Sequence, residues 1–179
     1  MKRYIAAGVI MIAFSCTNAE KKAAVSSDST ATASQEATAP TGVELKNAKV
    51  QGIYDGYINL KNALVATKYE DAKSAAAKLQ VSLAGYEGCE NTALTAEKIA
   101  SAKDIVAQRK EFTDLSSDVI ALFKHADVQK GSIFVQHCPM ANDGNGGDWL
   151  ASEKKIQNPY YGDEMMECGR VLKEIKSAK

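Results

Sequence analysis

The sequence has few of the residues and none of the short motifs that usually carry catalysis. Its 179 residues include four cysteines, two histidines, three prolines and one tryptophan. It contains no Cys-x-x-Cys pair, no HExxH zinc motif and no Gly-x-Ser-x-Gly motif. The usual signatures of a thioredoxin-like oxidoreductase, a zinc protease and a serine hydrolase are therefore missing. We predict that the protein is not an enzyme.

Charge of one sign is also lacking. The chain carries 22 basic and 22 acidic residues, for a formal net charge of zero. No Lys/Arg run is present that could neutralise a row of phosphates, so the sequence predicts no nucleic-acid partner.

The longest hydrophobic run lies near the N-terminus and is short. Lys2 and Arg3 precede the apolar stretch 4–14, which resembles the h-region of a signal peptide and is shorter than the about 20 residues that span a bilayer. Cys16 follows this stretch in a context similar to a lipobox, although Phe14 is larger than usual there. We expect residues 1–15 to be a lipoprotein signal peptide and Cys16 to be lipidated. An ordinary secretory signal with an incidental cysteine is the alternative.

Residues 16–43 are rich in Ala, Ser, Thr, Lys and Glu and show no apolar periodicity. Such a composition cannot bury enough surface to offset the entropy of ordering, so we expect a flexible tether. A helical domain, residues 44–179, would then be anchored to a membrane of the cell envelope and face the periplasm or the cell exterior.

Apolar residues recur at helical spacing through most of this domain. The spacing predicts helices from about Glu44 to Leu64, from Tyr69 to Tyr86, from Thr95 to Ala126 and from Asp163 onward. Short connections between helices favour antiparallel neighbours. The predicted fold is therefore all-α, an antiparallel four-helix bundle with a long loop before the last helix.

Soft metal ligands gather in the segment 131–169. His137, Cys138 and Met140 lie within four residues of each other, and Pro139 biases Cys138 toward extended backbone. Imidazole, thiolate and thioether form a donor set suited to Cu(I). The segment is therefore the candidate metal-binding segment.

Met165 and Cys168 are three residues apart on the expected last helix and would share a face. If that face turned toward the loop, both could join Cys138 and Met140 around one ion. Core packing of Met165 and Cys168 is an equal alternative. A disulfide between Cys138 and Cys168 is another, because an exported protein meets oxidising conditions. Cys89 could be a free thiol or pair with one of these two, and the spacing does not decide this.

The strings HCPMA and GGDWLASEKKIQNPYYGDEMMECG resemble the signature of a domain of unknown function that occurs in small exported proteins. The same domain occurs at the C-terminus of membrane-fusion proteins of copper/silver (heavy-metal) efflux systems. The strings IYDGYINLKNALVATKYEDAKSAAAKL and AQRKEFTDLSSDVIAL resemble its earlier helices, so the resemblance covers about residues 44–172. No adaptor hairpin or barrel-forming strands precede the domain in the sequence. The resemblance thus implies the metal-binding module and not an efflux adaptor.

Residues and resemblance together predict an exported, lipid-anchored copper-binding protein that sequesters Cu(I) or passes it to an efflux system. Its expected ligands are Cys138, Met140, Met165, Cys168 and His137. The alternative is a non-catalytic structural or interaction domain with a Cys138–Cys168 disulfide and a docking surface of Trp149, Tyr160 and Tyr161. A thiol oxidoreductase is a third, less favoured reading because no βαβ pattern is present.

Overall fold

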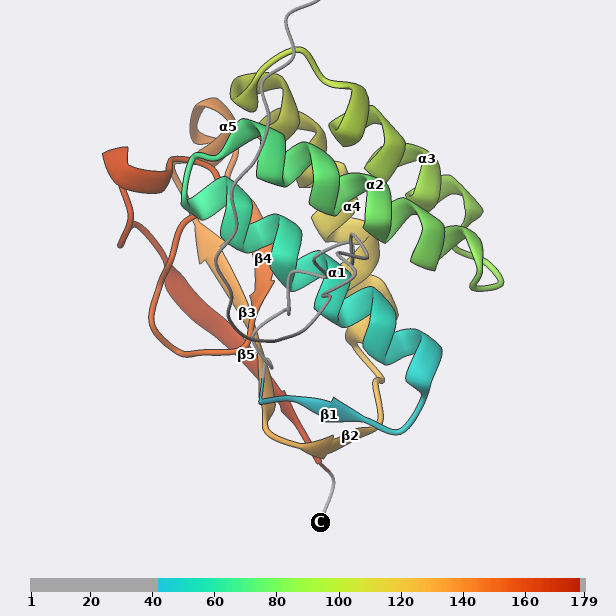
Figure 1. The fold of residues 1–179 in the computed structure, drawn as a ribbon. Coiled ribbons are helices and arrows are strands. Elements are labelled where there is room, and N and C mark those ends of the chain that lie inside the picture. Colours follow the sequence, from blue (N-terminus) through green and yellow to red (C-terminus); the bar gives the residue numbers. More distant parts are fainter. Residues whose placement is uncertain (1–41, 178–179) are drawn as a thin grey trace, which may run out of the picture. The chain divides into compact units, whose positions relative to one another are not determined.

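Four long helices, two single-turn helices and two small antiparallel sheets make up the part of the chain that the structure describes, residues 42–177 of a computed structural model (Figure 1). Consecutive helices pack against each other along the chain. They are α1 (Ala48–Val65), α2 (Tyr69–Ala84), α3 (Glu90–Ser101) and α4 (Ile105–Phe123).

The C-terminal part is a sheet and not a helix, so the predicted all-α four-helix bundle is wrong. The main sheet has the antiparallel order β4-β3-β5, and a second sheet pairs β1 with β2. The strands are β1 (Glu44–Leu45), β2 (Val128–Lys130), β3 (Ser132–Cys138), β4 (Gly147–Ala151) and β5 (Arg170–Lys176). Two single turns, α5 (Ala141–Gly144) and the 3-10 turn η1 (Gly162–Glu164), lie between strands.

The helix expected from Asp163 onward does not form, and two glycines interrupt this part of the chain. Gly162 has φ +56° and Gly169 has φ +151°, values that disfavour other residues and interrupt a helix. Beyond Gly169 the chain pairs with β3, from Ser132 opposite Lys176 to His137 opposite Arg170. The partner strand thus overrides the helical spacing of the C-terminal residues, because β5 pairs with β3 along its length, with one register shift between Val135 and Gln136.

The expected third helix is two helices. Ala102 takes extended backbone (ψ 146°), and the Asp104 side chain accepts a hydrogen bond of 2.8 Å from the Ala107 N–H at the start of α4. An Asp in this position caps a new helix. In the first turn of α4, Val106 is 71% exposed.

The predicted apolar stripes of the first two helices are confirmed as core. All eight residues are completely buried: Ile53, Tyr57, Leu60, Leu64, Ala72, Ala76, Leu79 and Leu83. Ala72 and Ala76 have small side chains, which permits the close approach of α1 and α2.

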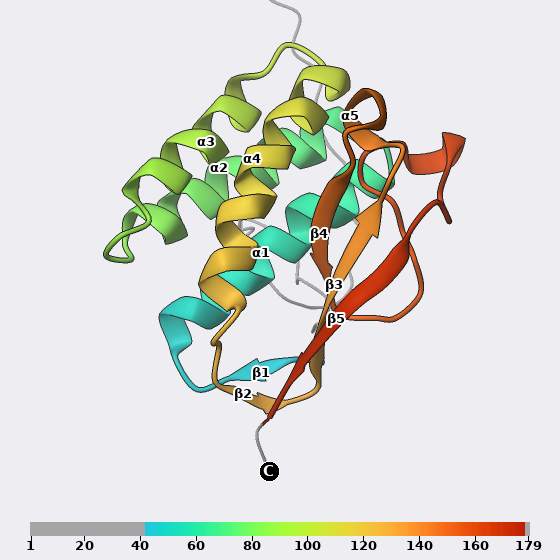
Figure 2. The same cartoon turned by 180° about the vertical axis from the view of Figure 1, so that it is seen from behind.

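Helices α1 and α4 cover one face of the main sheet, as Figures 1 and 2 show from opposite sides. The buried Tyr57 joins all three elements. Its hydroxyl lies 2.7 Å from Ser116 Oγ on α4 and accepts a hydrogen bond of 3.2 Å from the Leu150 N–H on β4. Burial raises the pKa of Tyr57 well above its ordinary value, so this hydroxyl stays neutral.

The segment between β4 and β5, residues 152–169, packs against both the sheet and the helices, and we call it the covering segment. The buried side chain of Gln136 on β3 donates to the backbone carbonyls of Glu153 (2.7 Å) and Lys155 (3.3 Å) in this segment. Arg109 on α4 donates to the Pro159 carbonyl (2.9 Å) and also to the Leu64 carbonyl at the end of α1 (3.0 Å). The segment is therefore held to both helices and to the sheet.

No helix within residues 42–177 is long and apolar enough to cross a membrane. The signal peptide, Cys16 and most of the tether, all predicted from the sequence, lie outside the described residues.

Candidate metal centre

The structure brings Cys138 and Cys168 together. Cys138 is the last residue of β3, opposite Gly147 on β4, and is completely buried. Cys168 lies in the covering segment just before β5 and is partly exposed. Their sulfur atoms are 2.9 Å apart, and both cysteines are free thiols. Strand β3 therefore positions the Cys138 thiol, and the covering segment positions the Cys168 thiol beside it.

This separation lies midway between two chemical states. In a disulfide the sulfurs are about 2.05 Å apart, and two sulfurs bonded at about 2.3 Å to a tetrahedral ion are roughly 3.8 Å apart. From 2.9 Å, either state requires a relative shift of about 0.9 Å. Cys168 can supply that shift because it is partly exposed and lies outside regular strands and helices. The pair is thus suited to hold an ion or to form a disulfide.

The backbones of both candidate methionines contact Cys168. The Met140 N–H donates to the sulfur of Cys168, and the Cys168 N–H donates to the Met165 carbonyl at 3.1 Å. Contact with the Cys138 thiol raises the pKa of Cys168, burial raises it further, and the Met140 N–H acts in the opposite direction. Cys168 must therefore lose a proton to become a metal ligand.

The methionine side chains differ in exposure. Met140 is 53% exposed, whereas Met165 is partly buried, and Met165 lies in the turn after η1 instead of on a helix. Thioether side chains are flexible enough to reach a neighbouring ion from such positions. The arrangement from solvent inward is thus Met140, then Cys168, then Cys138.

His137 lies away from this pair. Successive side chains of a strand point to opposite faces, so His137 and Cys138 point to opposite faces of β3. His137 Nδ1 lies 2.6 Å from Asp148 Oδ1, and its ring lines a groove of about 510 Å³ between α4 and β5. Of the five expected ligands, Cys138 and Cys168 have side chains in contact, whereas His137 points to the opposite face of β3.

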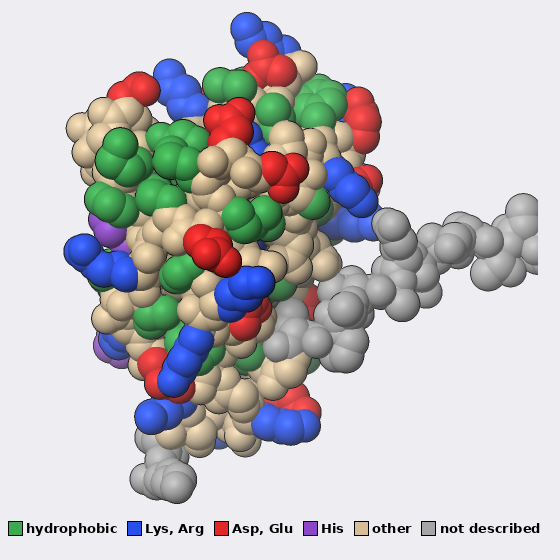
Figure 3. Space-filling model, turned by 90° about the vertical axis from the view of Figure 1, so that its left-hand side faces the viewer, with side chains coloured by type: hydrophobic (Ala, Val, Ile, Leu, Met, Phe, Trp, Pro, Cys, Tyr) green, Lys and Arg blue, Asp and Glu red, His purple; other side chains and the backbone are tan. Residues whose placement is uncertain are grey.

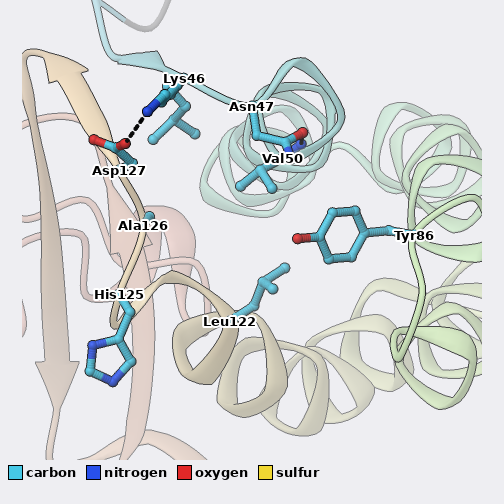
Figure 4. A pocket seen from close by; sticks show the side chains of 9 residues that line it. Lys46, Asn47, Val50, Tyr86, Leu122, His125, Ala126 and Asp127 are labelled. Carbon is cyan, nitrogen blue, oxygen red and sulfur yellow. Dashed lines mark hydrogen bonds and ion pairs between the residues drawn. The ribbon is translucent and has the colours of Figure 1, made fainter.

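The remaining cysteine and histidine lie elsewhere. Cys89 is buried in the turn before α3, and burial raises its pKa. His125 follows α4 and lies at the rim of a pocket of about 410 Å³ into which Tyr86 points (Figure 4). An ion pair of 3.6 Å between Lys46 and Asp127 borders the same pocket. Because Cys89 lies in the turn before α3, the cysteine that neighbours Cys138 is Cys168 and not Cys89.

Within the described part of the chain, no three His, Cys, Asp or Glu side chains converge as a metal site would require. A site at the cysteine pair would therefore need thioether or external ligands besides its two thiolates. The face of the molecule seen in Figure 3 carries hydrophobic side chains and charged side chains of both signs in mixture.

The expected aromatic docking surface is largely interior. Trp149 is completely buried and Tyr160 is 7% exposed, and their rings meet edge to face at a centroid distance of 6.1 Å. Tyr161 is partly exposed and donates to the Met140 carbonyl at 2.6 Å. These aromatic residues support the cysteine pair from within.

Residues that position Cys168 were not recognised from the sequence. Asn158 Nδ2 donates to the Cys168 carbonyl (3.0 Å), and the Asn158 N–H donates to the Met166 carbonyl (2.9 Å). Lys61, buried in α1, forms an ion pair of 3.1 Å with Glu153 at the start of the covering segment. The Asn-Pro step at 158–159 was the available signal, because it favours a turn.

No curated protein and no solved structure matches the chain. A family described as "Protein of unknown function (DUF3347)" matches residues 53–131. The matched region runs through the helices and ends before β3, so it does not include Cys138 or Cys168. The helical part of this chain is therefore similar to a domain family whose function is unknown.

Proposed function

We propose that this protein is an exported, lipid-anchored binding protein for a soft metal ion, Cu(I), with Cys138 and Cys168 as thiolate ligands. The contact of 2.9 Å between their sulfurs carries the proposal, because two thiolates are the donors that Cu(I) prefers. The protein sequesters the ion or passes it to a heavy-metal efflux system, and it catalyses no reaction.

Met140 and Met165 complete the proposed ligand set. Their backbones contact Cys168, and their flexible thioether side chains would turn toward the sulfurs to complete the set. His137 is left out of the set because it points to the other face of β3 and contacts Asp148.

Anaerobic titration of the purified, reduced full chain with Cu(I) against a chromophoric competitor tests this function. We expect Cys138→Ala/Cys168→Ala to weaken binding by at least about 100-fold, since changes around a metal's ligands alone cost 10–100-fold. Cys89→Ala is the matched control, because it removes a buried thiol away from the pair. Equal affinity of the double variant and the wild type would refute the proposal.

The anchor is tested separately. Membrane fractionation and mass spectrometry should find a diacylated N-terminal Cys16 in wild-type cells, and Cys16→Ala should lose the lipid. An unlipidated chain cleaved at a different residue would instead support an ordinary secretory signal.

A structural domain with a permanent Cys138–Cys168 disulfide is the second candidate, and the same sulfur contact favours it. Thiol counting on protein isolated without reductant distinguishes the two. A quantitative crosslink that resists glutathione would support the structural domain.

A further inference from the structure

We infer that Cys138 and Cys168 form a reversible disulfide couple that closes the metal site when oxidised. The metal half of this inference rests on the proposed function, whereas the redox half rests on the cysteine pair alone. The sulfurs are 2.9 Å apart, so a relative shift of about 0.9 Å reaches either the bridged or the ion-bound separation.

The two thiols differ in access. Cys138 is completely buried at the end of β3, whereas Cys168 is partly exposed in the covering segment. A reagent from solvent therefore meets Cys168 first, and Cys138 can act only from within.

The oxidant is a small or protein disulfide, RSSR. The Cys168 thiolate attacks one sulfur of RSSR, which forms a mixed disulfide and releases RS⁻. Cys138 then loses its proton and attacks the Cys168 sulfur, which forms the Cys138–Cys168 bond and releases the second RS⁻. The two released thiolates take up the two protons of the protein thiols. Two protein thiols are thus oxidised, and one RSSR is reduced to two RSH.

Oxidation requires little rearrangement of the covering segment. Gln136 Nε2 donates to this segment from β3, Asn158 Nδ2 donates to the Cys168 carbonyl within it, and Tyr161 Oη donates from it to the Met140 carbonyl. Both redox states therefore share one fold, and the chemical change is confined to the sulfurs. A bridged pair has no thiolate to offer, which leaves only the weaker thioethers as ligands.

The redox half is tested on the full chain in glutathione buffers of graded potential, without metal. Reactions are quenched with an alkylating reagent and analysed by peptide mass spectrometry. We expect a Cys138–Cys168 crosslink that forms and reverses with potential, an unchanged result in Cys89→Ala, and a glutathione adduct on Cys168 in Cys138→Ala. No crosslink at any potential, or one that no glutathione ratio reverses, overturns the inference.

The metal half is tested by Cu(I) titration of the reduced and the oxidised wild-type chain, which needs no variant. We expect oxidation to weaken binding at least about 100-fold, as expected when two ligands are lost. Equal affinity of the two forms overturns the closing of the site. If the reduced chain itself binds no Cu(I), the proposed function fails, whereas the potential-dependent crosslink decides the redox couple independently.

Discussion

The ion pair between Lys61 and Glu153 gives a sharp test of how the covering segment is held. The Lys61 side chain is 1% exposed, Glu153 is 40% exposed, and their charged atoms are 3.1 Å apart. Burial lowers the pKa of Lys61, and the carboxylate of Glu153 acts against that shift. The buried ammonium therefore depends on its partner more than the half-exposed carboxylate does.

Removal of either partner should have unequal effects. Glu153→Ala leaves a buried charge without this carboxylate, and breaking a buried pair in this way costs about 3–5 kcal/mol. Deprotonation of Lys61 limits the cost. For a lysine with the ordinary pKa of 10.5, loss of the proton at pH 7 costs about 4.8 kcal/mol. The same loss costs less when the pKa is lowered. We expect a loss of about 2–4 kcal/mol for Glu153→Ala and a change within about 1 kcal/mol for Lys61→Met.

Urea denaturation followed by circular dichroism measures both variants. The loss in Glu153→Ala should shrink as pH rises toward the lowered folded-state pKa of Lys61. Without Glu153 the folded variant gives up the Lys61 proton at a lower pH than the folded wild type, so its stability begins to rise with pH earlier. The double variant should match Lys61→Met. A larger loss for Lys61→Met than for Glu153→Ala would refute the reasoning.

Three further perturbations probe other parts of the account. Tyr57→Phe removes the acceptor of the buried Leu150 N–H and should lower the free energy of unfolding by about 1–3 kcal/mol, measured in urea; no loss would contradict the role of this hydroxyl. Gly162→Ala should destabilise the fold in the same assay, because Gly162 has φ +56° and a methyl group there would collide with Thr67; a neutral result would contradict this packing. The apparent Cu(I) affinity should rise with pH below the raised pKa of Cys168, since binding releases its proton; a pH-independent competition titration would exclude this thiol as a ligand.

The helical part could be predicted because its pattern is local. The stripe that includes Ile53 and Leu64 repeats at helical spacing and is buried as predicted. The break between α3 and α4 was missed although Asp104 is a favourable capping residue, because apolar residues on both sides continue the same approximate period.

The sheet was missed because its pairing is non-local. Strand β5 is an edge strand with almost every residue exposed, so it shows no alternation of buried and exposed residues that a sequence could reveal. Val171 and Ile175 fit a helix face as well as a strand. Only the partner strand β3, more than 30 residues earlier, decides between them.

The candidate site was predicted in part for the same reason. The sequence offered a meeting of Cys138 and Cys168 as one possibility, and their sulfurs lie 2.9 Å apart, although the predicted helix that would carry Cys168 does not exist. His137 was grouped with Cys138 because they are adjacent in sequence, which in a strand places them on opposite faces. Knowledge of β3 as a strand was the missing step.

X-ray absorption spectroscopy of the reduced full chain loaded with one equivalent of Cu(I) tests the central claim most directly. The account predicts a first shell made of sulfur alone, which Cys138→Ala/Cys168→Ala abolishes and Cys89→Ala leaves unchanged. A first shell dominated by nitrogen or oxygen, or a sulfur shell that persists in the double variant, would contradict the assignment of the cysteine pair as the metal site.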